Sequence, residues 1–132
     1  MNTRGEPMNI IISNSCGQPI YEQIVLQIKN LIISGSLKEG DALPSMRLLA
    51  KELRISVITT KRAYEELERE GFIVSYTGKG SYVASQNIEM LKEQKYREIE
   101  DYLRKTSETA KSCDVSLEEL TQMLQMIYKD EV

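Results

Sequence analysis

The chain has 132 residues, enough for one compact domain with an appendage or for two very small units. Its 41% hydrophobic and 28% charged residues are typical of a globular protein and exclude wholesale disorder. The absence of histidine removes the commonest general base and metal ligand, which argues against most hydrolases and metalloenzymes. No apolar run approaches the ~20 residues of a membrane-spanning helix. We therefore expect a cytoplasmic protein without catalytic residues, cofactor, metal site or membrane partner.

The net charge of −3 is unevenly distributed along the chain. Residues 19–84 carry nine Lys or Arg and eight Asp or Glu, whereas residues 85–132 carry seven and eleven, and the charges of the first 18 residues cancel. The acidity therefore belongs to the C-terminal third. Because a near-neutral segment can bind DNA when its cations gather on one face, the total charge does not exclude a nucleic-acid partner.

The first 18 residues are predicted to form an N-terminal extension. Its residues before Met8 are polar and are expected to be loose, while Asn9 to Ser13 has the composition of a short β-strand. Pro19 then suits the first turn of a helix and Gly35 suits its end. Between them, apolar residues recur at the spacing of an amphipathic helix, at Ile20, Ile24, Ile28, Leu31 and Ile32.

Two further helices joined by a tight turn are predicted after a loop over 37–44. Ser45 can cap the first of them, which stops near Arg54, and only about three residues, 55–57, separate it from a helix that runs to about Glu70. Such a pair is a helix-turn-helix. The residues expected to face inward are Leu48, Leu49 and Leu53 in the first helix and Ala63, Tyr64 and Leu67 in the second.

A β-hairpin is predicted directly after the helix-turn-helix. Its strands cover 72–76 and 81–84, and two glycines in Thr77–Gly80 permit the positive φ angles of a turn. Residues 19–84 are therefore expected to form a winged helix-turn-helix domain. Residues 85–132 are predicted to form two helices whose apolar stripes are too long for a small domain to cover alone, which indicates a dimerisation region. The predicted fold class is mainly α with a small β-hairpin wing, followed by a two-helix dimerisation tail.

The start of the second paired helix carries side chains suited to DNA. Short hydroxyls and long cations gather where a helix also presents free N–H groups and the positive end of its dipole. Hydroxyls and N–H groups can reach phosphates, and a cation can reach guanine in the major groove. A purely solvated face is the alternative, and it fits the acidic second half of this helix. The candidate residues are Ser56, Thr59, Thr60, Lys61 and Arg62, with Arg47 on the preceding helix.

The tip of the hairpin is a second candidate contact. Gly78 lets the backbone come close to a phosphate or enter a minor groove, and Lys79 supplies the cation beside Thr77. The alternative is an ordinary hairpin turn without a binding role.

An ordered set of motifs spans residues 19–84 without an obvious gap. It consists of Pro19–Ile24, Gly40–Arg47, Ala50–Leu53, Ala63–Tyr64, Leu67–Glu68, Gly71 and Gly78–Val83. This set resembles the winged-helix domain of the GntR family of bacterial transcription regulators. The short helical tail and the Ala63–Tyr64 pair resemble the YtrA subfamily, which lacks a large effector-binding domain and dimerises through its tail.

The resemblance implies a homodimeric, sequence-specific repressor that binds a palindromic operator in double-stranded DNA. Its target would be a neighbouring operon, often one encoding an ABC transporter and the regulator itself. In relatives, the positions of Ser45, Arg47, Ser56, Thr59, Lys61 and Gly78 contact DNA. Val57 stands where many relatives place an arginine that reads a base, and Met46 and Arg54 also depart from the family pattern. These departures concern the operator sequence and leave the fold unchanged.

A winged helix that binds proteins and has no DNA activity is the alternative function, and the net acidity favours it slightly. Such a module has no need for Ser56, Thr59, Lys61 and Lys79 to converge on one surface. An enzyme has no nucleophile and base to support it. Residues 85–132 identify no effector. Because the tail is too small to enclose a metabolite, a small-molecule effector would bind at the dimer interface or between tail and winged helix.

Overall fold

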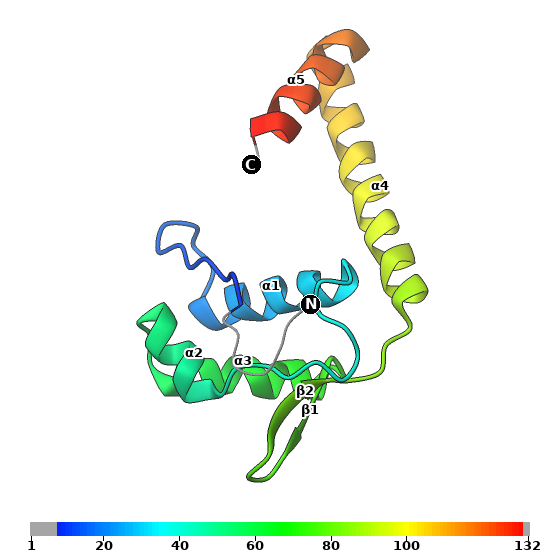
Figure 1. The fold of residues 1–132 in the computed structure, drawn as a ribbon. Coiled ribbons are helices and arrows are strands. Elements are labelled where there is room, and N and C mark those ends of the chain that lie inside the picture. Colours follow the sequence, from blue (N-terminus) through cyan, green and yellow to red (C-terminus); the bar gives the residue numbers. More distant parts are fainter. Residues whose placement is uncertain (1–7, 131–132) are drawn as a thin grey trace. The chain divides into compact units, whose positions relative to one another are not determined.

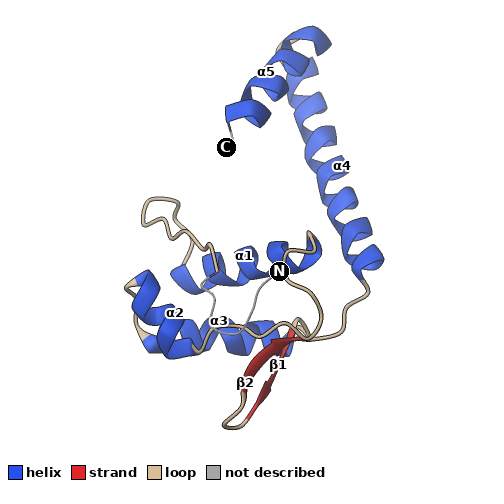
Figure 2. Cartoon of the chain, viewed as in Figure 1, coloured by secondary structure: helices blue, strands red, loops and turns tan. Residues whose placement is uncertain are grey.

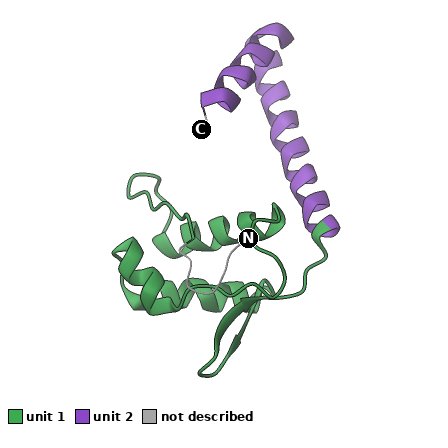
Figure 3. Cartoon of the chain, in the orientation of Figure 1, with its two compact units in different colours: residues 1–88 green, residues 89–132 purple. Residues whose placement is uncertain are grey.

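The computed structural model describes residues 8–130 (Figure 1), so the tail expected to be loose over residues 1–7 lies outside the described part. The elements in chain order are α1 (Ile20–Ile33), α2 (Met46–Leu53), α3 (Val57–Arg69), β1 (Ile73–Tyr76), β2 (Gly80–Val83), α4 (Ile88–Ser112) and α5 (Leu117–Asp130) (Figure 2). The chain divides after Ile88 into two compact units (Figure 3). The predicted fold class, mainly α with one small hairpin, is confirmed.

The core of the first unit forms where α3 packs against both α1 and α2. The residues predicted to face inward from α3 are all buried, and Leu49 is the buried leucine of α2. Leu48 and Leu53 differ from the prediction because they are only half-buried, since Leu49 and Ala50 take the side of α2 that meets its neighbours. The large side chains that are fully buried are Ile24, Ile28, Ile32, Leu37, Leu49, Tyr64 and Leu67.

Local interactions fix the turn between α2 and α3. Arg54 ends α2 in the left-handed conformation, with φ 58° and ψ 47°. The Ile55 N–H then donates to the carbonyl of Ala50 at 3.0 Å. Ser56 caps α3, because its Oγ accepts from the Thr59 N–H at 3.1 Å. Three residues, 54–56, thus join the two helices in the tight turn that a helix-turn-helix requires.

The hairpin is held to the segment that precedes α2. β1 and β2 pair antiparallel, from Ile73 opposite Val83 to Tyr76 opposite Gly80. The predicted loop before α2 also hydrogen-bonds to β2. The Leu43 N–H donates to the Ser81 carbonyl and the Val83 N–H donates to the Asp41 carbonyl, both at 2.9 Å. The wing is therefore fixed in position relative to the start of α2.

The strand predicted over 9–13 is wrong, because the structure assigns no strand there. The backbone of this segment instead binds two glutamine side chains of α1. Gln27 accepts from the Ile11 N–H at 2.9 Å and donates to the Ile11 carbonyl at 2.7 Å. Gln23 does the same for Ser13, with both distances 2.8 Å. Side-chain amides thus take the place that a neighbouring strand would have, and Ile10 is buried beside them.

The second unit consists of α4 and α5 joined by a short turn. Asp114 takes a left-handed φ of 59°, and the N–H groups of Cys113 and Val115 both donate to the Ala110 carbonyl. Ser116 caps α5 by accepting from the Glu119 N–H at 3.1 Å. Among the helices within residues 8–130, none is long and apolar enough to cross a membrane.

Candidate nucleic-acid interface

The first turn of α3 presents unpaired donors and a cation to solvent. Ser56, Val57 and Lys61 are exposed, and Thr59 is half-buried. The N–H groups of Val57 and Ile58 have no acceptor among residues 8–130, as expected for the first turn of a helix. Lys61 makes no ion pair within the same residues. Helix N–H groups, hydroxyls and a lysine in one turn form a surface that suits an anion such as a phosphate.

Two predicted residues of α3 lie elsewhere. Thr60 is fully buried and its hydroxyl donates to the Ser56 carbonyl at 3.3 Å, so the expectation that it contacts DNA is corrected. Its position shares the core side of the helix with Ala63, Tyr64 and Leu67. Arg62 is exposed, but its guanidinium lies 3.9 Å from the centre of the Tyr21 ring on α1. Arg62 therefore contacts α1 in a cation–π interaction in this structure.

The start of α2 resembles the start of α3. Ser45 is exposed and its Oγ accepts from the Leu48 N–H at 3.1 Å, which leaves the N–H groups of Met46 and Arg47 without an acceptor among the described residues. Arg47 is exposed on the first turn of the helix. The predicted pair Ser45 and Arg47 thus lies at a second helix N-terminus with free donors.

The wing tip is built to hold Lys79 in a defined turn. Gly78 and Gly80 have φ angles of 74° and 90°, which other residues rarely adopt. The Lys79 N–H donates to the Tyr76 carbonyl at 2.9 Å, and the Tyr82 hydroxyl donates to the Lys79 carbonyl at 2.7 Å. The Thr77, Gly78 and Lys79 side of the turn remains exposed.

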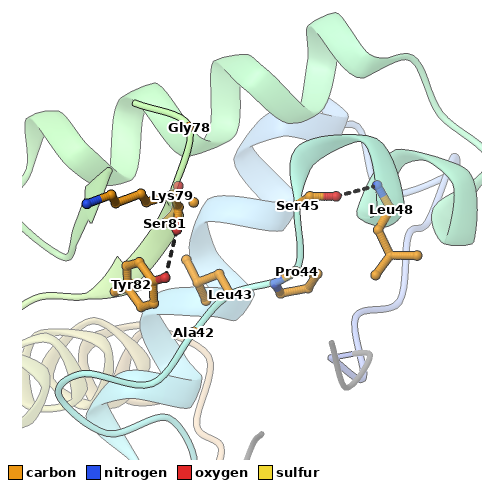
Figure 4. A pocket seen from close by; sticks show the side chains of 10 residues that line it. Ala42, Leu43, Pro44, Ser45, Leu48, Gly78, Lys79, Ser81 and Tyr82 are labelled. Atoms are coloured by element: carbon orange, nitrogen blue, oxygen red, sulfur yellow. Dashed lines mark hydrogen bonds between the residues drawn. The ribbon is translucent and has the colours of Figure 1, made fainter. Parts of the chain in front are cut away.

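A cleft of about 570 Å³ separates this tip from the start of α2. Figure 4 shows Ser45 and Leu48 on the α2 side of the cleft and Lys79, Ser81 and Tyr82 on the wing side. The cleft joins two of the predicted contact points, the capped helix start and the cationic tip. The exposed Lys79 on the wing side and the N-terminus of α2 on the other side suit a negatively charged chain.

The acidic residues of α3 are held away from its first turn. Glu66 pairs with Arg69, and Glu70 pairs with Lys29 of α1 at 2.5 Å. The hydrogen bond from Arg69 holds the pKa of Glu66 below its usual range. Glu66 and Glu70 are therefore engaged with cations near the C-terminal end of α3 rather than with Lys61 or Lys79.

Ile58 was not predicted as part of the site, yet 80% of it is exposed on the first turn of α3. A signal for it was present in the sequence. Ile58 falls on the opposite side of a 3.6-residue helix from Ala63, Tyr64 and Leu67, where a polar residue is expected.

Comparison with known proteins identifies the family. Residues 20–83 match the model of the bacterial regulatory proteins of the gntR family. The chain is 39% identical over 112 residues to the HTH-type transcriptional repressor YtrA of Bacillus subtilis, an alignment that covers 85% of this chain and 86% of that protein. The chain belongs to the GntR family. It is YtrA-like, it carries the family's DNA-binding winged helix-turn-helix, and this family consists of transcription regulators rather than enzymes.

Solved structures of other GntR proteins share the fold. YtrA from Sulfolobus acidocaldarius, a GntR-family transcription factor, is 42% identical with a TM-score of 0.56, over 68% of this chain and 96% of that one. A GntR family transcriptional regulator from Listeria monocytogenes is 28% identical with a TM-score of 0.67, over 85% of this chain and 97% of that one. The likeness to the Listeria regulator therefore covers most of both chains.

Proposed function

We propose that the chain is a homodimeric transcriptional repressor that binds a palindromic operator. α3 enters the major groove with Lys61 and the hydroxyls of Ser56 and Thr59, and the wing tip with Lys79 meets the minor groove or the backbone. The observation that carries the proposal is the start of α3, where N–H groups and Lys61, none with a partner among residues 8–130, lie together on a GntR winged helix. A winged helix that binds only proteins does not need N–H groups, hydroxyls and a lysine arranged to bind phosphates.

The second unit supports the homodimer. Within residues 89–130, Ala110 alone is classed as buried. Large apolar side chains on both helices are exposed: Met90, Tyr96, Ile99, Tyr102 and Leu103 on α4, and Leu117, Met123, Leu124, Met126, Ile127 and Tyr128 on α5. A helix pair with so much exposed apolar surface gains stability when a second copy covers it. A two-fold dimer then presents two recognition helices to a palindromic site, with half-sites one helical turn or a multiple of it apart.

The target is proposed from the resemblance rather than from geometry. YtrA-like relatives suggest a neighbouring operon that encodes an ABC transporter and the regulator itself. The upstream region of the chain's own gene is therefore the duplex to use in a first binding experiment.

Replacing Lys61 tests the proposed contact. We expect Lys61→Ala to weaken binding to the upstream duplex and to lower the slope of log affinity against log salt concentration by about one unit for each of the two copies, because each copy loses one phosphate contact. Titrations by fluorescence anisotropy at four salt concentrations measure both quantities. Lys38→Ala is the matched control, since Lys38 is exposed beside the opposite end of β2 from the wing tip.

The two variants separate the possible results. A lower slope for Lys61→Ala with an unchanged slope for Lys38→Ala supports the assignment. If all three proteins give the same affinity and slope, Lys61 does not contact a phosphate. If the wild-type protein binds the upstream duplex and a scrambled duplex equally well, the proposed repressor function is wrong.

A further inference from the structure

Ile58 is an apolar side chain at the centre of an otherwise polar surface. Its exposed fraction is 80%, and that of its neighbour Val57 is 44%. On α3 the buried residues are Thr60, Ala63, Tyr64 and Leu67, and Ile58 lies on the opposite side of the helix. The side chain therefore points away from the core of its own unit and contributes no burial to it.

The surroundings of Ile58 are those of the proposed DNA contact. Lys61 follows it by three residues and therefore lies on the same side of the helix. The Ile58 N–H itself has no acceptor among residues 8–130. An apolar side chain that is exposed here gains free energy when an apolar group covers it in a complex.

We infer that Ile58, with Val57 beside it, recognises thymine by packing against the 5-methyl group in the major groove. This inference rests on the proposed function. The thymine methyl is the apolar group that the base edges present in the major groove, and it distinguishes thymine from the other bases there. The chain thus offers the major groove an apolar pair that favours A·T over G·C.

The small apolar area of Ile58 and Val57 argues that a methyl group, rather than a protein, covers these two side chains. A stable protein interface buries on the order of 1,200–2,000 Å², whereas two aliphatic side chains flanked by Lys61 and free N–H groups offer a far smaller apolar surface. The same polar groups match phosphates on either side of a groove. A duplex satisfies both the donors and the aliphatic pair at once.

Exchange of thymine for deoxyuridine tests the inference, because it removes the methyl group and keeps the base pair. A duplex selected by the wild-type protein from random-sequence DNA is resynthesised with one thymine replaced in each half-site, position by position. We expect the wild-type protein to lose about fifteenfold in affinity at one or two positions, since each of the two methyl groups lost is worth about fourfold. Ile58→Ala is expected to bind the thymine and deoxyuridine duplexes almost equally at those positions.

The control is Ile11→Ala, which removes the same side chain from a site that is 70% exposed on the N-terminal segment. This variant is expected to keep the full preference for thymine.

The inference is overturned if the wild-type protein tolerates deoxyuridine at every position, or if Ile58→Ala retains the preference. Either result leaves specific DNA binding intact, whereas failure to select any duplex overturns the proposed function and the inference together. A change in the mass of Ile58→Ala in sedimentation would show that Ile58 contacts another copy of the chain, and would also overturn it.

Discussion

Arg54 carries backbone strain in the turn of the helix-turn-helix. Its φ of 58° is in the left-handed region, which costs a residue with a Cβ about 1–2 kcal/mol relative to the right-handed helix. The Arg54 N–H still donates to the Lys51 carbonyl, so the cap is formed in spite of the strain.

Arg54→Gly is therefore expected to stabilise the first unit. We predict a free energy of unfolding higher by about 0.5–1 kcal/mol, because relief of the strain exceeds the entropy that glycine adds to the unfolded chain. Urea unfolding at a fixed protein concentration measures it. Arg54→Ala loses the same charge and keeps the Cβ, so it shows no such gain. Equal stability of the two variants would contradict the account of the turn.

Tyr64 joins α3 to the segment before α2 through a buried hydrogen bond. Its hydroxyl donates to the Pro44 carbonyl at 2.7 Å, and burial raises the pKa of the phenol well above its ordinary value. The folded state thus holds the proton more tightly than the unfolded state. Stability from this group is complete below pH ~10 and is lost as the pH rises above that value, at up to about 1.4 kcal/mol per pH unit.

Tyr64→Phe separates the hydrogen bond from the packing of the ring. At pH 7 we expect a loss of about 1–3 kcal/mol, because the Pro44 carbonyl is left buried without its partner. Between pH 9 and 11 the wild-type protein should lose stability more steeply than the variant, since Phe does not titrate. Parallel pH profiles of the two proteins in urea unfolding would show that Tyr64 does not contribute in this way.

At the scale of elements, α1 organises the N-terminal segment through Gln23 and Gln27. Each glutamine binds both the N–H and the carbonyl of one backbone residue, Ser13 and Ile11 respectively. Gln23 also donates to the Gln18 carbonyl at 3.0 Å and is buried. The two contacts are separate, so the segment is held at two points on one helix face.

Removing each glutamine should release only its own contact. Gln27→Ala is predicted to speed amide hydrogen exchange at Ile11, and Gln23→Ala at Ser13, because each N–H loses its acceptor. Each variant is the control for the other, and exchange within α1 should change little. NMR-detected exchange measures the individual amides. Unchanged protection at Ile11 in Gln27→Ala would contradict the contact.

The helices and the hairpin could be predicted because their signals are local. The cap at Ser45, apolar periodicity and the two glycines of the wing are read within a few residues. The pairing of Asp41 and Leu43 with β2 depends on residues about 40 positions away, and composition alone does not show it. The docking of the N-terminal segment on α1 was missed for the same reason.

Within the candidate site, the side of the helix on which a residue lies predicts its exposure better than the residue type does. Thr60 was included for its hydroxyl, although its spacing from Ala63, Tyr64 and Leu67 already places it on the buried side. Ile58 was omitted because it is apolar, although the same spacing places it outside. The contact between Arg62 and Tyr21 joins two helices and could not be predicted from either one.

At the scale of the whole molecule, the proposed function gives the two units different roles. The unit that ends at Ile88 offers the recognition helix and the wing, and the unit that follows offers exposed apolar helices to a second copy. Residues 85–132 carry a net charge of −4 (seven Lys or Arg, eleven Asp or Glu), whereas residues 19–84 carry +1 (nine and eight), so the charge that suits phosphates belongs to the first unit. Under the proposed function, specific binding requires both copies, because each copy contributes one α3 to the palindrome.

The mass of the complex on a palindromic duplex tests this claim most directly. Sedimentation velocity is expected to show two chains per duplex and a dimer in the absence of DNA. Leu124→Glu, which places a charge on the exposed apolar surface of α5, is expected to sediment as a monomer and to bind far more weakly. One chain per duplex, with the same affinity for a single half-site as for the full palindrome, would contradict the account.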